Sequence, residues 1–131
     1  MEYKRYTGKH AKSLVTKLMA ESTTTDFHLH ANQWLNEKNE VKCYVLCEGS
    51  TVKTMALLSK CDYDPMHQHS NPYTLNYIYT YPNHRRLGYA CKMLIYLKSK
   101  EQTTAFCDSD ESEALFAKAQ YIDYGGPYRY P

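Results

Sequence analysis

Apolar residues recur at helical spacing near the start of the chain. Between residues 9 and 21 this spacing predicts a helix, and a second is predicted after Asp26, a residue type that caps helix starts. A short strand at residues 2–7, EYKRYT, is predicted before them. The predicted inward positions of the two helices are Ala11, Leu14, Val15, Leu18 and Met19, followed by Phe27, Ala31, Trp34 and Leu35.

The middle of the chain changes to strand patterns. VKCYVLC at 41–47 and TVKTMALLSK at 51–60 flank the turn EGS, which predicts an antiparallel hairpin. Residues 61–72, CDYDPMHQHSNP, are predicted to be a loop. The next nine residues, YTLNYIYTY, are rich in β-branched and aromatic side chains and predict a strand that Pro82 ends.

The last third alternates helix and strand. A helix is predicted over residues 87–100, a strand at TTAFC (103–107), a helix at DESEALFAKA (110–119), and a last strand broken at Gly125 and Gly126. The inward positions expected for the first of these helices are Leu87, Ala90, Cys91, Leu94 and Leu97. The order predicts a single α/β (α+β) domain over residues 1–131, with a mixed central sheet flanked by about four helices.

The composition argues against several classes of protein. Sixteen Lys and Arg against fourteen Asp and Glu give a formal charge of +2, which argues against bulk binding of nucleic acid or membrane. No apolar stretch is long enough to cross a bilayer, and we expect no signal peptide because MEYKRYTGKH is polar. Five cysteines, an odd number, indicate reduced core thiols, so we expect a cytoplasmic protein.

A metal site is weakly indicated. His67 and His69 lie in the 61–72 loop with Cys61, Asp62 and Asp64, but no spacing typical of zinc ligands supports a site. We interpret this segment as a solvated polar loop and expect no metal.

The stretch Thr80–Leu94, TYPNHRRLGYACKML, places a strand end, a basic turn and a helix start together. A helix N-terminus carries unpaired N–H groups and partial positive charge, which bind anions. Gly88 lets a phosphate approach the main chain, and Arg85 and Arg86 add charge. The alternative is an ordinary strand–helix connection with a capping glycine.

This stretch resembles the coenzyme signature of the GNAT superfamily of acetyl-CoA-dependent N-acetyltransferases. That signature is a strand followed by [Q/R]-x-x-G-x-[G/A], and the order of elements over nearly the whole chain is also similar. The resemblance implies that acetyl-CoA is the cosubstrate, that its pantetheine arm pairs with the predicted strand, and that this strand and TTAFC splay into a wedge. It also implies an N–H near Ile78 or Tyr79 that polarises the acetyl carbonyl. The implied coenzyme-binding residues are Ile78, Tyr79, Thr80, Arg85, Arg86, Leu87, Gly88, Tyr89 and Ala90.

A second motif of that superfamily is only partly present. In SDESEALFAKAQY, Leu115 and Lys118 match, whereas Phe116 stands where many members carry the tyrosine that protonates the leaving thiolate. Tyr121, Tyr124 or Tyr79 are candidate substitutes. The general base stays open among Asp108, Asp110, His67, His69 and a water chain through Tyr77 and Asn76.

The resemblance implies an N-acetyltransferase in which an amine, on a protein lysine, an N-terminus or a small molecule, attacks the thioester directly. The alternative is a coenzyme-A-binding or protein-interaction domain with little or no activity, which fourteen tyrosines also favour. Nucleic-acid binding through His84, Arg85 and Arg86 is a third interpretation. A homodimer is expected if the tail leaves a strand edge unpaired.

Overall fold

The computed structural model describes residues 1–21, 25–60, 72–106, 110–123 and 128–130. Within these ranges, every helix is too short or too polar to cross a membrane. The chain begins with β1 (Glu2–Thr7), followed by α1 (Gly8–Ala20) and α2 (Thr25–Leu35). A hairpin of β2 (Val41–Glu48) and β3 (Thr51–Lys60) leads to β4 (Pro72–Thr80). The second half consists of η1 (Pro82–His84), α3 (Tyr89–Lys100), β5 (Gln102–Phe106), α4 (Asp110–Lys118), β6 (Ile122–Asp123) and β7 (Tyr128–Tyr130).

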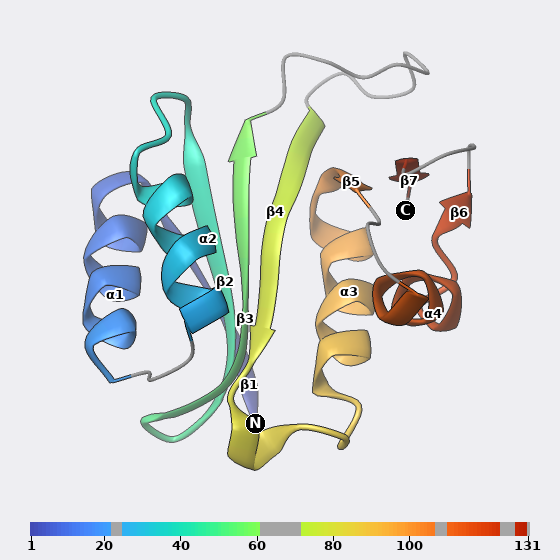
Figure 1. Cartoon of the computed structure of the whole chain (residues 1–131), viewed down its shortest axis with the longest axis horizontal. Coiled ribbons are helices and arrows are strands. Elements are labelled where there is room, and N and C mark those ends of the chain that lie inside the picture. Colours follow the sequence, from blue (N-terminus) through green and yellow to red (C-terminus); the bar gives the residue numbers. More distant parts are fainter. Residues whose placement is uncertain (22–24, 61–71, 107–109, 124–127, 131) are drawn as a thin grey trace.

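All strands join one mixed sheet in the order β1-β2-β3-β4-β5-β7-β6. Neighbouring strands are antiparallel except β4 and β5, which are parallel and connected through α3. Helices α1 and α2 cover one face of the sheet, and α3 and α4 cover the other (Figure 1). The predicted domain class, the mixed sheet and the order of elements are therefore confirmed.

Each face of the sheet has its own apolar core. The core under α1 and α2 contains Val15, Phe27 and Trp34, and the Trp34 indole donates a hydrogen bond to the buried Leu58 carbonyl at 2.9 Å. The core under α3 and α4 contains Leu94 and Phe116. Most predicted inward positions of the first two helices are buried, because their helical spacing presents one stripe to the sheet.

Two helix starts differ from the sequence prediction. Helix α2 begins at Thr25, so Asp26 lies inside its first turn. Helix α3 begins at Tyr89 rather than at residue 87, because Arg86 and Gly88 both have positive φ, which a right-handed helix does not accommodate. The inward position predicted for Leu87 is wrong, since this side chain is 58% exposed in the turn before the helix.

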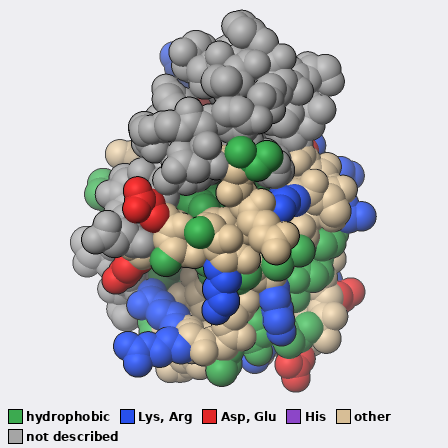
Figure 2. All heavy atoms as spheres, turned by 90° about the vertical axis from the view of Figure 1, so that its right-hand side faces the viewer, with side chains coloured by type: hydrophobic (Ala, Val, Ile, Leu, Met, Phe, Trp, Pro, Cys, Tyr) green, Lys and Arg blue, Asp and Glu red, His purple; other side chains and the backbone are tan. Residues whose placement is uncertain are grey.

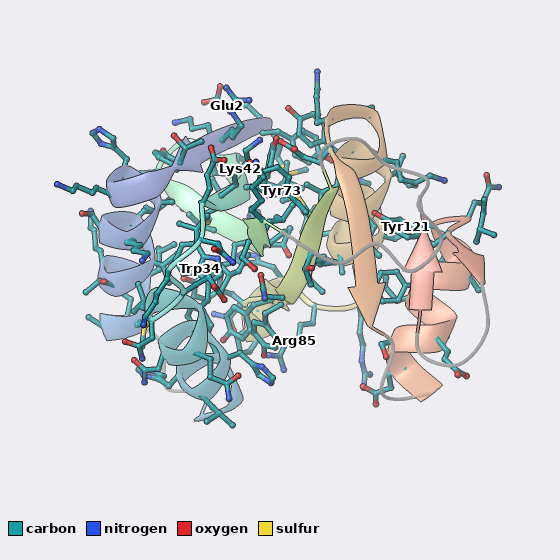
Figure 3. All side chains as sticks on the ribbon, turned by 90° about the horizontal axis from the view of Figure 1, so that it is seen from above. Glu2, Trp34, Lys42, Tyr73, Arg85 and Tyr121 are labelled. Atoms are coloured by element: carbon teal, nitrogen blue, oxygen red, sulfur yellow. The ribbon has the colours of Figure 1, made fainter. Side chains whose placement is uncertain are left out.

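A buried ion pair ties β2 to the chain between α3 and β5. Lys42 Nζ lies 2.9 and 3.1 Å from the two carboxylate oxygens of Glu101, and the Tyr44 hydroxyl donates to the same carboxylate at 2.6 Å. Lys42 Nζ also lies 4.3 Å from the centre of the Tyr73 ring, the side chain beside it in Figure 3. This network lies where β4 and β5 are paired.

Candidate active site

The parallel strands β4 and β5 are paired only at their beginnings. The register runs from Pro72 opposite Gln102 to Leu75 opposite Ala105, and beyond Leu75 no described residue of β5 lies opposite β4. Strand β4 continues to Thr80. The predicted wedge between these strands is therefore present, and it opens toward the end of β4 that leads into α3 (Figure 1).

A β-bulge in β4 lies at the closed end of the wedge. Leu57 of β3 pairs with Tyr77, whereas Leu58 pairs with Leu75, so Asn76 is an extra residue without a partner on β3. Because of the extra residue, side chains two positions apart across the bulge point to opposite faces of the sheet. Leu75 packs under α3 and α4, whereas Tyr77 and Tyr79 pack against the core under α1 and α2.

The bulge also determines which main-chain groups of β4 face the wedge. Tyr81 N–H donates to the Lys53 carbonyl at 3.2 Å, so the residues in register with it, Tyr79 and Tyr77, direct their amides toward β3 as well. Ile78 and Thr80 direct theirs away from β3, into the wedge. Of the two amides considered from sequence, that of Ile78 therefore has the orientation needed to meet a ligand in the wedge.

The turn between β4 and α3 presents a series of amide groups. Lys92 N–H donates to the Gly88 carbonyl at 3.0 Å as the first bond of the helix, which leaves the amides of Tyr89, Ala90 and Cys91 without an intrahelical acceptor. The N-cap residue, Gly88, has no side chain that could cap them. Gly88 has φ of +81°, and apart from its own chain neighbours no described atom lies within 4 Å of the position that a Cβ would take there. Space for a ligand thus lies directly over the helix start.

Arg85 is held in place beside this turn. Its Nε donates to the Thr80 carbonyl at 2.9 Å, and its guanidinium lies 5.6 Å from the centre of the Tyr79 ring. The Arg85 amide donates to the Pro82 carbonyl at 3.4 Å, so the amide series available to a ligand begins after Arg85. The Arg85 side chain therefore supplies fixed positive charge at the mouth of the wedge.

A pocket of about 570 Å³ joins the wedge to the helix start. Eight of the nine residues predicted to bind the coenzyme line it, and Leu87, which does not, lies exposed beside it. Sequence reasoning missed Cys91, His84 and Glu111 as lining residues. Glu111 shares a helical face with Leu115 and Lys118 of the second motif. Its role in the lining could therefore have been predicted from this spacing in the sequence. The described residues that line the pocket are Tyr77, Ile78, Tyr79, Thr80, His84, Arg85, Arg86, Gly88, Tyr89, Ala90, Cys91, Glu111, Leu115 and Lys118.

The charge around this pocket favours an anion. Arg85, Arg86 and Lys118 line it against a single described carboxylate, that of Glu111. Lys and Arg side chains also lie on the lower half of the α3–α4 side of the molecule, toward the end where the β4–α3 turn lies (Figure 2). Together with the free amides, the arrangement suits an extended ligand with phosphate groups at one end and amide groups along its length.

Of the described residues considered from sequence as the general acid or general base, only some line this pocket. Tyr79 lines the pocket, but its ring is 3% exposed and stacks on Phe27 with centroids 4.4 Å apart. Tyr121 does not line it. Its hydroxyl donates to the Leu94 carbonyl at 3.3 Å, and Figure 3 shows it well apart from Arg85. Of the two residues considered for a water chain, Tyr77 lines the pocket and Asn76 does not. Asp108, His67, His69 and Tyr124 lie outside the described residues, as does the side chain of Asp110.

Phe116 is a core residue. Its side chain is 4% exposed, its ring centroid lies 5.2 Å from that of Tyr121, and it does not line the pocket. Helix α4 presents Leu115 to the pocket and turns Phe116 inward. The loop considered as a metal site lies outside the described residues, and elsewhere in the described chain no three His, Cys, Asp or Glu side chains form a group able to hold an ion.

Solved structures resemble this architecture over almost the entire chain. The aminoglycoside antibiotic 6'-N-acetyltransferase AAC(6')-IG from Acinetobacter haemolyticus matches with a TM-score of 0.57 and 20% identity, covering 94% of this chain and 92% of its own. The chain has the fold of the GNAT N-acetyltransferases. A second GNAT structure, AAC(6')-Iy with a bisubstrate analogue, matches with a TM-score of 0.59 and 14% identity, covering 95% and 94% of the two chains.

A third GNAT-fold structure is a predicted acetyltransferase with acetyl-CoA from Clostridium acetobutylicum. It matches with a TM-score of 0.58 and 17% identity and covers 93% of this chain and 90% of its own. No protein-family model matches the sequence, and a search of curated protein sequences gives no match. At these identities the comparison establishes the GNAT fold alone.

Proposed function

We propose that this protein is an acetyl-CoA-dependent N-acetyltransferase. The observation that carries the proposal is the continuity of the wedge with the turn at Gly88: one pocket contains the inward-facing amide of Ile78 and the free amides at the start of α3. The diphosphate of coenzyme A fits the turn, and the pantetheine arm fits the edge of β4. Two of the similar structures, one with a bisubstrate coenzyme A analogue and one with acetyl-CoA, support this choice of cosubstrate.

The proposed acetyl transfer can be followed step by step at this site. The Ile78 amide is directed at the place where negative charge develops on the acetyl oxygen. A neutral amine attacks the acetyl carbon, a C–N bond forms, the C–S bond breaks, and the electron pair leaves on the coenzyme thiolate. The amine proton passes to solvent or to a base. A thiol of pKa about 8.5 leaves without obligatory protonation, so the absence of a tyrosine at position 116 does not prevent the step.

A coenzyme-binding domain without transferase activity is the second candidate. Phe116 favours it, because the position expected to supply a proton donor is part of the core. Calorimetric titration with acetyl-CoA followed by a thiol-release assay over a panel of amines separates the two. Binding with amine-dependent thiol release supports the transferase, whereas binding alone supports the second candidate. No binding refutes both.

A matched pair of glycine variants tests the site itself. Gly88→Ala places a methyl group where a ligand is expected, and Gly8→Ala places one at the start of α1, at a similarly positive φ with nothing within 4 Å. Both variants should lose about 1–2 kcal/mol of folding stability, the penalty for a left-handed alanine. Only Gly88→Ala should weaken acetyl-CoA binding, by about tenfold or more, since one charge-assisted hydrogen bond is lost. Equal affinities for the two variants would show that the ligand does not bind over Gly88.

A further inference from the structure

A second pocket lies across β4 from the coenzyme pocket. Its volume is about 590 Å³, and it is bordered by the end of α1, the β2–β3 turn and the segment from Tyr79 to His84. Tyr79 and His84 line both pockets. A molecule in the second pocket therefore lies next to the coenzyme on the opposite side of the end of β4.

Glu21 gives this pocket its charge. It is the single carboxylate among the described residues that line the pocket, and no described Lys or Arg forms an ion pair with it. The phenol ring of Tyr81 borders the same pocket, and the Tyr81 hydroxyl is buried without a hydrogen-bond partner among the described residues. Burial, together with the nearby Glu21 charge, raises the pKa of Tyr81, so the phenol stays neutral there.

The surroundings restrict where a cation is favoured. A smaller hollow of about 200 Å³ adjoins the pocket and shares Glu21 with it, but Lys4 and Lys17 line that hollow. Positive charge is disfavoured there. The ring of Tyr81 also lines the second pocket, and no described Lys or Arg does. Tyr79 is 3% exposed, stacks on Phe27 and already faces the Arg85 guanidinium, so its ring is not open to a further cation. An ammonium group between Glu21 and the Tyr81 ring gains both the carboxylate and an aromatic face.

The acetylated nitrogen cannot be this ammonium group, because a nitrogen must lose its proton before it attacks a thioester. Glu21 lines the second pocket and not the coenzyme pocket, so it holds charge away from the reacting centre. Resting on the proposed function, we propose that the acceptor is a diamine or longer polyamine. One nitrogen stays protonated beside Glu21 while the other, neutral, reaches the thioester beside Ile78 past Tyr79, which lines both pockets.

The test compares 1,4-diaminobutane with 1-aminobutane, which has the same carbon chain and one nitrogen. Thiol release gives kcat and KM for both amines with the wild-type chain, Glu21→Gln and Glu48→Gln. Glu48 is an exposed carboxylate at the same end of the sheet that borders none of these pockets, so it controls for the general field. Glu21→Gln should raise KM for the diamine about fivefold, as expected for an exposed ion pair, and leave KM for the monoamine and both kcat values unchanged.

The outcomes separate this proposal from the proposed function. Acetyl-CoA binding must be the same in all three chains, since Glu21 lies outside that pocket. A diamine preference that Glu21→Gln removes, and that 0.5 M NaCl weakens in the wild type, supports the proposal. Amine-dependent thiol release without a diamine preference, or with equal effects of Glu21→Gln and Glu48→Gln, refutes the polyamine acceptor and leaves the transferase standing. If no amine releases thiol, 1,4-diaminobutane is titrated into the coenzyme-loaded wild type and Glu21→Gln variant. Weaker binding to the variant supports the proposal, and equal or undetectable binding to both refutes it.

Discussion

Replacement of Glu101 by glutamine should destabilise the fold far more than its conservative shape suggests. The Glu101 and Lys42 side chains are 7% and 13% exposed, and the carboxylate accepts hydrogen bonds from Lys42 and from the Tyr44 hydroxyl. The amide NH2 of glutamine, itself a donor, would face either Lys42 Nζ or the Tyr44 hydroxyl. The positive charge of Lys42 would also lose its partner. Removing one partner of a buried pair costs about 3–5 kcal/mol, and the slight exposure of Lys42 favours the lower end.

The assay is urea denaturation monitored by circular dichroism, with thermal unfolding as a second measure. A loss of about 3 kcal/mol corresponds to a fall in Tm of about 10 °C for a chain of this length. Glu48→Gln, on an exposed residue, should change stability by less than about 0.5 kcal/mol. The double variant Lys42→Met, Glu101→Leu should recover much of the loss, because both charges are then absent. A Glu101→Gln variant within about 1 kcal/mol of the wild type would refute this reasoning.

Three further predictions concern pH, the core and thiol reactivity. Burial raises the pKa of Tyr73 to about 12 and also raises that of Tyr44, whereas the unfolded chain releases these protons near pH 10, so folding stability should fall from about pH 10 to pH 12 in urea titrations. Phe116→Tyr should lower Tm while thiol release stays the same or rises, since the new hydroxyl enters the core. Burial raises the pKa of Cys43 to about 12, so mass spectrometry should find iodoacetamide on half-buried Cys91 well before Cys43.

Periodicity in the sequence predicted the elements well because each buries one stripe or one face. The helix with Ala11, Val15 and Leu18 and the hairpin of alternating residues were recognisable for this reason. The bulge at Asn76 was not predictable, since YTLNYIYTY reads as one uninterrupted strand. Yet this single extra residue decides that the Ile78 amide, and not that of Tyr79, faces the wedge.

The pocket at the start of α3 was largely predictable and the second pocket was not. Most of the described lining of the first comes from the segment between Tyr77 and Cys91, although Tyr81, Pro82, Asn83 and Leu87 do not line it and α4 adds Glu111, Leu115 and Lys118. The second brings together Glu21, the β2–β3 turn and His84, which are distant in sequence and meet only through the packing of α1 beside the sheet. Phe116 was correctly recognised as a departure, but its burial beside Tyr121 required the structure.

The incomplete pairing of β4 with β5 has a consequence for how the protein behaves when no ligand is present. An interior strand whose last residues turn amides outward offers a docking edge to any extended peptide, including an identical segment of another molecule. An occupant of the wedge covers that edge, so the protein with an empty wedge should be more prone to self-association. Supplying the ligand during purification should suppress aggregation for the same reason.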